Sequence, residues 1–402
     1  MKITRFVIVS LLLLGVAVSC DRRTQVKNVI YLIGDGMGMG AVSSLVLSEV
    51  MPTGFELSPV IGLSETASAN NHVSDSPAGG TALATGVLTI NGHTGVDPDG
   101  KQLTSILYKA QHMGKKTGIV VNTTLTESTP AAFYGGVTSR KMTYELAKQL
   151  TESNVDLAIG AGLEHFVNRP DSLDLTAVFI DKGYDVYLNW SAVLNTRSDK
   201  FIGILPLADV HRREEKTVEA GAADGQEFCL AARLAAQLEN VDTAQISEPE
   251  MYLEKATAKA LDVLSRNNKK GFFLMVESAI IDGYGHNNDT EGLVEEMREF
   301  NRTLSELISY VEKNPETLLV VTGDHETGGV AVSYNEFPQG SSAPVKLRYT
   351  TKGHSGTLVP VFAYGAGAEN FAGIKKNKDN PNKILQIMRE MLLAPNLLVL
   401  DE

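Results

Sequence analysis

Short runs of apolar and β-branched residues alternate along the chain with longer amphipathic segments. Most of these runs are hydrophobic at nearly every position, instead of alternating with polar residues, and this predicts strands that are buried on both faces. The predicted strands are Asn28–Ile33, Gly118–Val121, Leu157–Ile159, Gly271–Val276, Thr317–Val321 and Pro360–Tyr364.

Helical patterns lie between these strands. In one of them, Leu253, Ala256 and Ala260 recur at helical spacing, and in the last Asn380 and Pro381 suit a cap and a first turn. Buried strands that alternate with helices predict a doubly wound fold, which is a three-layer α/β/α sandwich around a large, mostly parallel central sheet. The predicted helices are Ser139–Glu152, Glu248–Asn267 and Asn380–Leu393.

No repeat or low-complexity linker divides the 402 residues. Length alone suits two or three domains of about 150 residues, but large α/β sheets often absorb such lengths with insertions. We therefore expect one domain over residues 20–402. Residues 171–250 have weak periodicity and no usable motif, so we expect an insertion or a less regular region that shapes a site entrance or an oligomer contact.

The N-terminal segment has the pattern of a signal peptide. Lys2 and Arg5 precede the uninterrupted apolar run Phe6–Val18, which is too short to span a membrane comfortably. A buried core helix would have to end in the polar stretch that follows, so the pattern favours export, with residues 1–19 as the signal peptide.

Cys20 closes this run in a context that resembles a bacterial lipoprotein cleavage site, although Ala17 stands where Leu is usual. We therefore expect a mature chain that begins at a lipidated Cys20 and is periplasmic or membrane-anchored in a Gram-negative bacterium. Asp21, next to this cysteine, does not decide whether the anchor lies in the inner or the outer membrane. Cys229 is interpreted as a small buried hydrophobic residue; it could pair with Cys20 only if no lipid were attached.

The amino-acid composition and the net charge exclude some classes of function. With 43% hydrophobic and 21% charged residues, the chain can bury a large core and is not disordered. The 48 acidic and 36 basic residues give a net charge of −12. This is the wrong sign for a protein that binds nucleic acid through its phosphates, so we expect no nucleic-acid partner.

Polar side chains follow several of the predicted strands. Asp35 follows the first strand, Glu277 and Asp282 follow Gly271–Val276, and Asp324 and His325 follow Thr317–Val321. Ligands of such sheets bind beyond the carboxyl ends of the strands. These side chains should therefore meet at one edge.

Several of these residues are candidate metal ligands. Asp282 and His286 lie four residues apart, on one face of a helical turn, and a carboxylate with an imidazole suits zinc. Alone, such a pair is more often a capping arrangement. Asp324 and His325 open a glycine-rich loop, and His354 lies in another flexible loop, where a single histidine is usually only solvated.

Ser76 is the candidate nucleophile. It precedes Pro77, which fits the first position of a helix, so we expect Ser76 to be the cap and its hydroxyl to lie where backbone N–H groups favour an anion. An ordinary serine cap is the simpler alternative. Because the segment Ser74–Gly86 has no Gly-x-Ser-x-Gly elbow and no neighbouring histidine makes a Ser-His-Asp arrangement, activation of this serine would have to come from metal.

Two further residues complete the candidate site. Thr129, in Thr129-Pro130, follows a strand and offers a hydroxyl. Arg140 offers a planar fork that matches two phosphate oxygens, although a solvated arginine at a helix start is the simpler reading of that residue alone.

Together these segments resemble the alkaline phosphatase family, in the same order and with similar spacings from Val26 to Gly367. The resemblance implies two Zn²⁺ and one Mg²⁺ as cofactors. It assigns to one zinc Asp35, Ser76, Asp324 and His325, to the other zinc Asp282, His286 and His354, to the magnesium Asp35, Thr129 and Glu277, and to the phosphate Arg140.

The implied reaction is hydrolysis of small-molecule phosphate monoesters. Ser76 would attack phosphorus, a covalent phosphoserine would form, and water would then release inorganic phosphate. The resemblance also implies a homodimer. The chain departs from the family at Glu127, where relatives carry Asp or His near the magnesium, and at Gly283, where relatives carry a larger residue near the phosphate.

Other functions remain open from the sequence. A phosphodiesterase or sulfatase of the same superfamily shares the two-zinc core, but a diesterase needs room where Arg140 and the third metal would lie. A sulfatase would carry an arginine shortly after the nucleophile, which Ser76–Gly80 lacks. A surface lipoprotein that captures zinc or phosphate without turnover is the non-enzymatic alternative.

Overall fold

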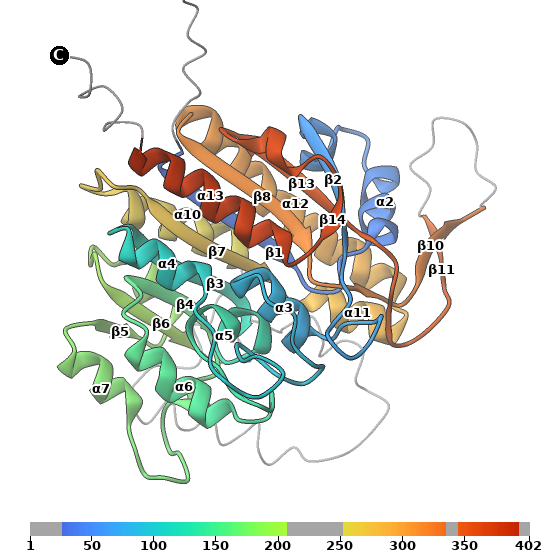
Figure 1. Cartoon of the computed structure of the whole chain (residues 1–402). Helices are drawn as coiled ribbons and strands as arrows, with labels where there is room; N and C mark the ends of the chain where they lie inside the picture. The colour runs from blue at the N-terminus through green and yellow to red at the C-terminus, as the bar shows by residue number, and fades with distance from the viewer. Residues whose placement is uncertain (1–25, 207–251, 335–344, 394–402) are drawn as a thin grey trace, which may run out of the picture.

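The computed structural model describes residues 26–206, 252–334 and 345–393. At its centre lies a ten-stranded sheet with the order β14-β2-β13-β8-β1-β7-β3-β4-β6-β5 (Figure 1). Neighbouring strands are parallel except at β13, which runs antiparallel to both β8 and β2. The strands are β1 (Asn28–Gly34), β2 (Val60–Glu65), β3 (Lys116–Thr124), β4 (Leu157–Ala161), β5 (Asp185–Tyr187), β6 (Phe201–Leu205), β7 (Phe272–Ser278), β8 (Thr317–Gly323), β13 (Val359–Gly365) and β14 (Gly373–Lys376).

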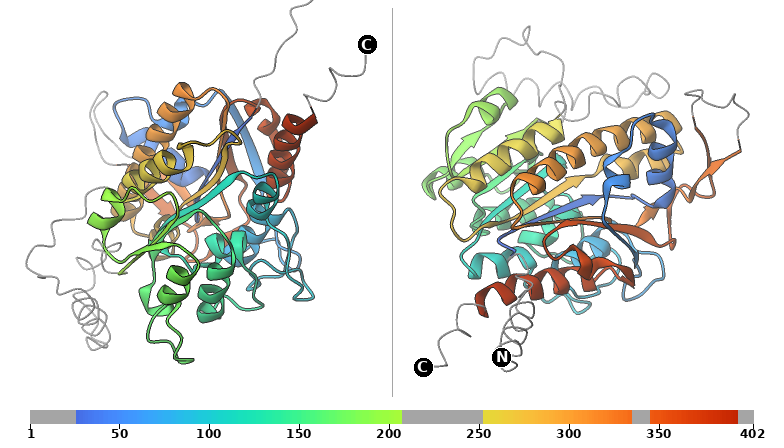
Figure 2. Two further views of the ribbon diagram at one scale, coloured as in Figure 1. Left: turned by 90° about the vertical axis from the view of Figure 1, so that its left-hand side faces the viewer. Right: turned by 90° about the horizontal axis from the view of Figure 1, so that it is seen from above.

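Helices cover both faces of this sheet (Figure 2), so the predicted three-layer sandwich is confirmed. One layer contains α3 (Ser76–Thr85), α4 (Ile106–His112), α5 (Ser128–Tyr134), α6 (Thr143–Glu152), α7 (Leu175–Asp181) and α13 (Asp379–Leu393). The other contains α2 (Met39–Ser48), α8 (Trp190–Asn195), α10 (Tyr252–Ser265) and α12 (Thr290–Lys313). The short helix α11 (Ile280–Asn287) follows β7 at the carboxyl edge.

Smaller elements complete the described chain. Two-stranded sheets pair β10 with β11 and β9 with β12. Their bounds are β9 (Glu326–Thr327), β10 (Val330–Ser333), β11 (Lys346–Tyr349) and β12 (His354–Ser355), and the 3-10 helices are η1 (Gly54–Leu57), η2 (Leu163–His165) and η6 (Ala368–Phe371).

All six predicted strands belong to the central sheet, and the three predicted helices correspond to α6, α10 and α13. Two helix starts differ from the prediction. The helix α6 begins only at Thr143, because Ser139 and Met142 close a turn through a backbone hydrogen bond of 3.0 Å. The helix α13 begins at Asp379, so Asn380 lies inside its first turn and is not its cap.

Residues 171–206 add β5 and β6 to the edge of the central sheet, together with α7 and α8. The rest of the segment 171–250 lies outside the described residues, as do Cys229, the predicted signal peptide and Cys20. Among the helices that the structure describes, none has the length and apolar character to cross a membrane.

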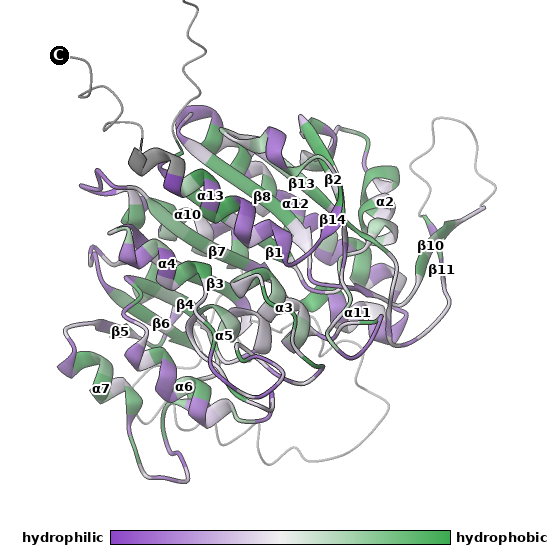
Figure 3. Ribbon diagram, viewed as in Figure 1, coloured by the Kyte–Doolittle hydropathy of each residue, from purple (hydrophilic) through white to green (hydrophobic). Residues whose placement is uncertain are grey.

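Side chains of each central strand alternate between two apolar cores. On β1, Val29, Tyr31 and Ile33 pack toward the layer of α3 and α5, whereas Ile30 and Leu32 pack toward the layer of α12. Figure 3 shows the resulting continuous hydrophobic strands. Each buried aliphatic side chain contributes about 1.5–3 kcal/mol. The uninterrupted hydrophobic runs in the sequence thus reflect two separate cores.

Lys115 lies at the opposite, amino-terminal edge of the sheet. It is buried and its ammonium group donates to the carbonyls of Lys27 and Lys270, at 2.6 and 2.9 Å. Burial, with a smaller effect from the charge of Lys27, lowers the pKa of Lys115 from 10.5 to about 8. Between these pH values the unfolded chain holds a proton that the folded chain has lost, so this group makes folding more favourable as pH rises.

We therefore expect the stability of the wild type, relative to Lys115→Met, to increase between pH 7.5 and pH 10. Urea unfolding of both metal-loaded proteins at the two pH values measures this change. An unchanged difference between them would contradict the lowered pKa.

Candidate active site

The candidate site lies where the adjacent strands β8, β1, β7 and β3 end. Gly34 of β1 is in register with Gly323 of β8 and with Ser278 of β7. Asp35 and Asp324, which follow these strands, and Glu277, at the end of β7, therefore lie at nearly the same level. The order of the strands thus brings together residues that are almost 300 positions apart in the sequence.

A first group of side chains surrounds His325, which is fully buried. Its Nε2 atom lies 3.4 Å from Asp35 Oδ1 and 3.2 Å from Asp324 Oδ2. The same nitrogen lies 3.2 Å from the hydroxyl oxygen of Ser76. The two carboxylates and the imidazole are close enough to one another to hold a single metal ion.

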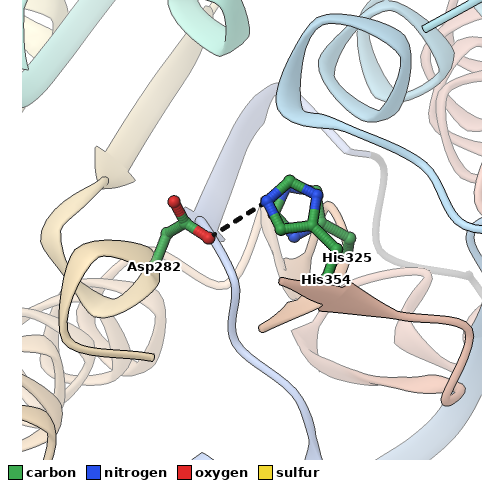
Figure 4. A group of neighbouring side chains, drawn as sticks. All are labelled: Asp282, His325 and His354. Atoms are coloured by element: carbon green, nitrogen blue, oxygen red, sulfur yellow. Dashed lines mark ion pairs between the residues drawn. The ribbon is translucent and has the colours of Figure 1, made fainter. Parts of the chain in front are cut away.

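A second group surrounds Asp282. Its Oδ2 atom lies 3.2 Å from His286 Nε2, one turn further along α11, and its Oδ1 atom lies 3.5 Å from His354 Nε2 (Figure 4). His354 is the first residue of β12, and this strand pairs with β9 so that His354 lies opposite Thr327.

The two groups adjoin. The ring of His354 stacks on that of His325, with centroids 3.6 Å apart, and Figure 4 shows both rings facing Asp282. Asp282, His325 and His354 also lie close enough together to share an ion. The structure therefore offers two neighbouring cation positions beside the Ser76 hydroxyl.

Each histidine of the site is oriented through its other ring nitrogen. Nδ1 of His354 lies 2.9 Å from the carbonyl of Ser74, and Nδ1 of His286 contacts the carbonyl of Lys352. Nδ1 of His325 lies 3.2 Å from the hydroxyl of Thr327, which also donates to Asp282. With Nδ1 protonated, the lone pair of each Nε2 is free to bind a metal ion.

Glu277 and Thr129 form an all-oxygen part of the site. Both are buried, and neither the Glu277 carboxylate nor the Thr129 hydroxyl makes a hydrogen bond by distance and angle among the described residues. Thr129 is nevertheless near enough to lower the pKa of Glu277, and the charge of Glu277 acts on Asp35. These oxygens lack the partners that buried polar groups normally have.

Burial has a large effect on the acids of this site. It raises the pKa values of Asp35 and Glu277 well above their usual range, and repulsion from Asp324 raises both further. Burial likewise raises the pKa of Asp324 to about 7. At least one oxygen of each of the three carboxylates has no hydrogen-bond donor among the described residues. Buried carboxylates in this condition need positive charge, so the residues fit divalent cations.

The histidines differ in their protonation. Burial lowers the pKa of His325 to about 3, so this ring is neutral and ready to act as a ligand. His286, which is more exposed, has its pKa raised to about 9 by the hydrogen bond with Asp282. A metal ion at this place would have to displace that proton.

Ser76 is placed differently from the sequence prediction. The cap of α3 is Asp75, whose backbone is extended and whose Oδ1 atom accepts from the N–H of Ala78 at 3.0 Å. Ser76 is the first residue of the helix and Pro77 the second. Since the carboxylate does the capping, the Ser76 hydroxyl is free to face His325.

Two glycines let α3 approach the site closely. A Cβ atom on Gly79 would lie 2.9 Å from the carbonyl oxygen of Asp324, and one on Gly80 would lie 2.8 Å from Cα of Thr129. Any larger residue would push the helix away. Gly79 and Gly80 therefore fix the distance between Ser76 and the candidate ligands.

Arg140 lies at the rim of the site. Its guanidinium donates to the Glu127 carboxylate at 3.1 Å, and both side chains are nearly half exposed. Its charge lowers the pKa values of Asp35 and Glu277, so it acts on the group without directly joining the ligands. At Gly283, which directly follows Asp282, an added Cβ would meet nothing within 4 Å.

Sequence reasoning missed the groups that orient the histidines. Thr327 lies in the same glycine-rich loop as His325, two residues later, and could have been singled out there. The carbonyls of Ser74 and Lys352 could not have been singled out, because every residue has a backbone carbonyl and the residue type does not indicate its role.

Comparisons with known proteins point to one family. The family model described as alkaline phosphatase matches residues 26–345. Alkaline phosphatase 4 of Bacillus subtilis is 29% identical, over 91% of this chain and 90% of that protein. The solved alkaline phosphatase of the Antarctic bacterium TAB5 is 30% identical, with a TM-score of 0.76, over 92% of this chain and 99% of that one. A histidine-to-glutamate mutant of the TAB5 enzyme, also 30% identical with a TM-score of 0.76 over 92% and 99% of the two chains, was solved with Mg bound in its M3 site.

Proposed function

The chain belongs to the alkaline phosphatase family and hydrolyses phosphate monoesters with the help of metal ions, and we propose that Ser76 is the nucleophile that becomes a covalent phosphoserine. One observation carries this assignment. Ser76 is buried at the start of α3, and its hydroxyl lies 3.2 Å from His325 Nε2, beside both candidate metal groups.

The proposed cofactors are two Zn²⁺ and one Mg²⁺. Mixed nitrogen and oxygen donors suit zinc, whereas an all-oxygen set suits magnesium. One zinc would be held by Asp35, Asp324 and His325 together with Ser76, the second by Asp282, His286 and His354, and magnesium by Asp35, Thr129 and Glu277.

Bound divalent ions would lower the pKa of a serine hydroxyl or a water and neutralise the charge of the phosphoryl oxygens and the departing oxygen. The Ser76 oxygen then attacks phosphorus while the bond from phosphorus to the ester oxygen breaks, and the alcohol leaves with a proton. Water attacks the phosphoserine, breaks the bond between phosphorus and the Ser76 oxygen, and releases inorganic phosphate. Ser76 is thereby restored with its proton.

Arg140 is the proposed phosphate-binding residue. Its planar fork can donate to two phosphoryl oxygens, and its contact with Glu127 holds the fork at the rim of the site. Charged hydrogen bonds of this kind contribute about 1.5–3 kcal/mol.

We expect Arg140→Lys to lower kcat/KM for a phosphate monoester by about 10- to 100-fold, since lysine keeps the charge but loses the paired donors. Steady-state kinetics with a chromogenic monoester measure the loss. Lys141→Ala is the control, because Lys141 is the exposed neighbour. Equal kinetics in the two variants would remove Arg140 from the phosphate site.

The substrate class is tested with three esters in parallel. The metal-replete wild type should strongly prefer a phosphate monoester over a matched diester and a sulfate ester. Preference for the diester would favour a phosphodiesterase of the same superfamily, and preference for the sulfate ester would favour a sulfatase. Binding of zinc and phosphate without turnover would favour a capture protein.

The cellular setting is likewise a proposal. The basic residues Lys2 and Arg5 and the apolar run that follows support export, with residues 1–19 removed and a lipid on Cys20 holding the single catalytic domain to a membrane or in the periplasm of a Gram-negative bacterium. Family membership supports a homodimer. Mass spectrometry of the mature N-terminus tests the cleavage and the lipid, and light scattering tests the dimer.

A further inference from the structure

Neighbouring residues of a strand face opposite layers of the sandwich, and this rule continues to the strand ends beside the site. On β7, Met275 packs toward α3 and α5, whereas Val276 packs toward α12. Glu277 therefore faces the metal side with Met275, and Ser278 faces α12 with Val276. On β3, the same alternation places Asn122 on the α12 side.

A buried carboxylate of α12 meets these two side chains. Glu296 is only 5% exposed, and its Oε1 atom accepts from Asn122 Nδ2 at 2.9 Å and from Ser278 Oγ at 2.7 Å. The Oδ1 atom of Asn122 in turn accepts from the backbone N–H of Ala279 at 2.8 Å. The Glu296 carboxylate therefore links the ends of β3 and β7 on the face of the sheet that α12 covers, opposite the face of Glu277.

The same residues are bonded to the backbone of the candidate ligands. The carbonyl of Ser278 accepts from the N–H of Asp35 at 2.9 Å, and Ser278 directly follows Glu277. Ala279 is the cap position of α11, the helix that carries Asp282. The network thus contacts the backbone beside three candidate ligands, on the turn after β1 and on the β7–α11 segment, and these ligands belong to both candidate zinc positions and to the magnesium position.

We propose that Glu296 is a positioning residue for the metal centre, acting through Asn122 and Ser278. This inference rests on the metal ligands of the proposed function. Residues behind the ligands commonly change metal affinity by about 10- to 100-fold when they are removed, because ligands held in place lose less freedom on binding. A purely structural role would lower stability and leave metal affinity unchanged.

Four full-length variants separate the two roles. Glu296→Ala removes the acceptor, Ser278→Ala removes one donor with little change in volume, and Glu296→Gln keeps an oxygen acceptor at the same place. Thr303→Val is the matched control, since Thr303 is fully buried on the same helix and its hydroxyl donates to the carbonyl of Glu299.

Each protein is loaded with Zn²⁺ and Mg²⁺ and dialysed against graded chelator, and its metal content is measured by elemental analysis. The melting temperature of the metal-free form is recorded separately. We expect Glu296→Ala and Ser278→Ala to lose their metal at a free chelator concentration about 10- to 100-fold lower than the wild type requires. Thr303→Val should retain the wild-type metal content curve, and Glu296→Gln should lie closer to the wild type than to Glu296→Ala.

Wild-type metal affinity in Ser278→Ala and in a folded Glu296→Ala, whatever their melting temperatures, would overturn the inference. If Glu296→Ala does not fold, Ser278→Ala decides alone. A Glu296→Gln protein as weak as Glu296→Ala would overturn the hydrogen-bonding basis. A wild type that holds no metal would instead overturn the proposed function, so the two failures are distinguishable.

Discussion

Ser76→Ala is expected to lower kcat for a phosphate monoester by roughly 10⁴-fold or more, because the proposed covalent route requires this oxygen. The variant leaves Asp35, Asp324 and His325 in place, so metal content should change little. Any residual turnover would come from direct attack by water in the same electrostatic surroundings. Steady-state kinetics give the loss, and mass spectrometry of acid-quenched wild type should find the phosphate on Ser76.

The control for this substitution is Ser44→Ala. Ser44 is also buried, but it lies within α2 and its hydroxyl donates to the carbonyl of Ala41. It should retain wild-type kcat. A Ser76→Ala enzyme that retains most of its kcat, with the phosphate trapped on another residue, would refute the assignment of the nucleophile.

The sequence predicted the central part of the fold well and its margins less well. Runs such as Leu318–Val321 fill two cores at once, so they are hydrophobic at every position and easy to identify. The strand β14 is largely exposed and β5 has three residues, so neither left a clear pattern. The 24-residue helix α12 was not predicted, although Leu293, Met297 and Leu304 recur in it at helical spacing.

The residues of the candidate site could be predicted from the sequence, but the contacts that position them could not. The rule that ligands bind beyond the carboxyl ends of parallel strands placed Asp35, Asp324 and Glu277 together before any distance was known. The capping of α3 by Asp75 instead of Ser76 was missed, because two adjacent residues with similar cap preference cannot be separated by sequence alone. The role of Glu296 depends on a contact between elements that only the packing of α12 against β7 and β3 reveals.

Metal removal is expected to abolish turnover and also to destabilise the fold. Asp35, Glu277 and Asp324 are buried with oxygens that lack donors among the described residues, so a cation that leaves exposes their mutual repulsion. An ion present at 1,000 times its Kd contributes about 4 kcal/mol to stability, so the melting temperature should fall by several degrees or more.

Glu277→Gln tests the cause of this effect, because it removes one buried charge with almost no change in shape. In chelator at alkaline pH, where an ionised Glu277 is most unfavourable, this variant should melt at a higher temperature than the metal-free wild type. With saturating Mg²⁺ the order should reverse, since the variant has lost a proposed magnesium ligand. Thermal unfolding of both proteins, with and without metal, measures the two differences. If chelation left the melting temperature and turnover of the wild type unchanged, with metal loss verified by elemental analysis, the carboxylates would not be balanced by cations at all.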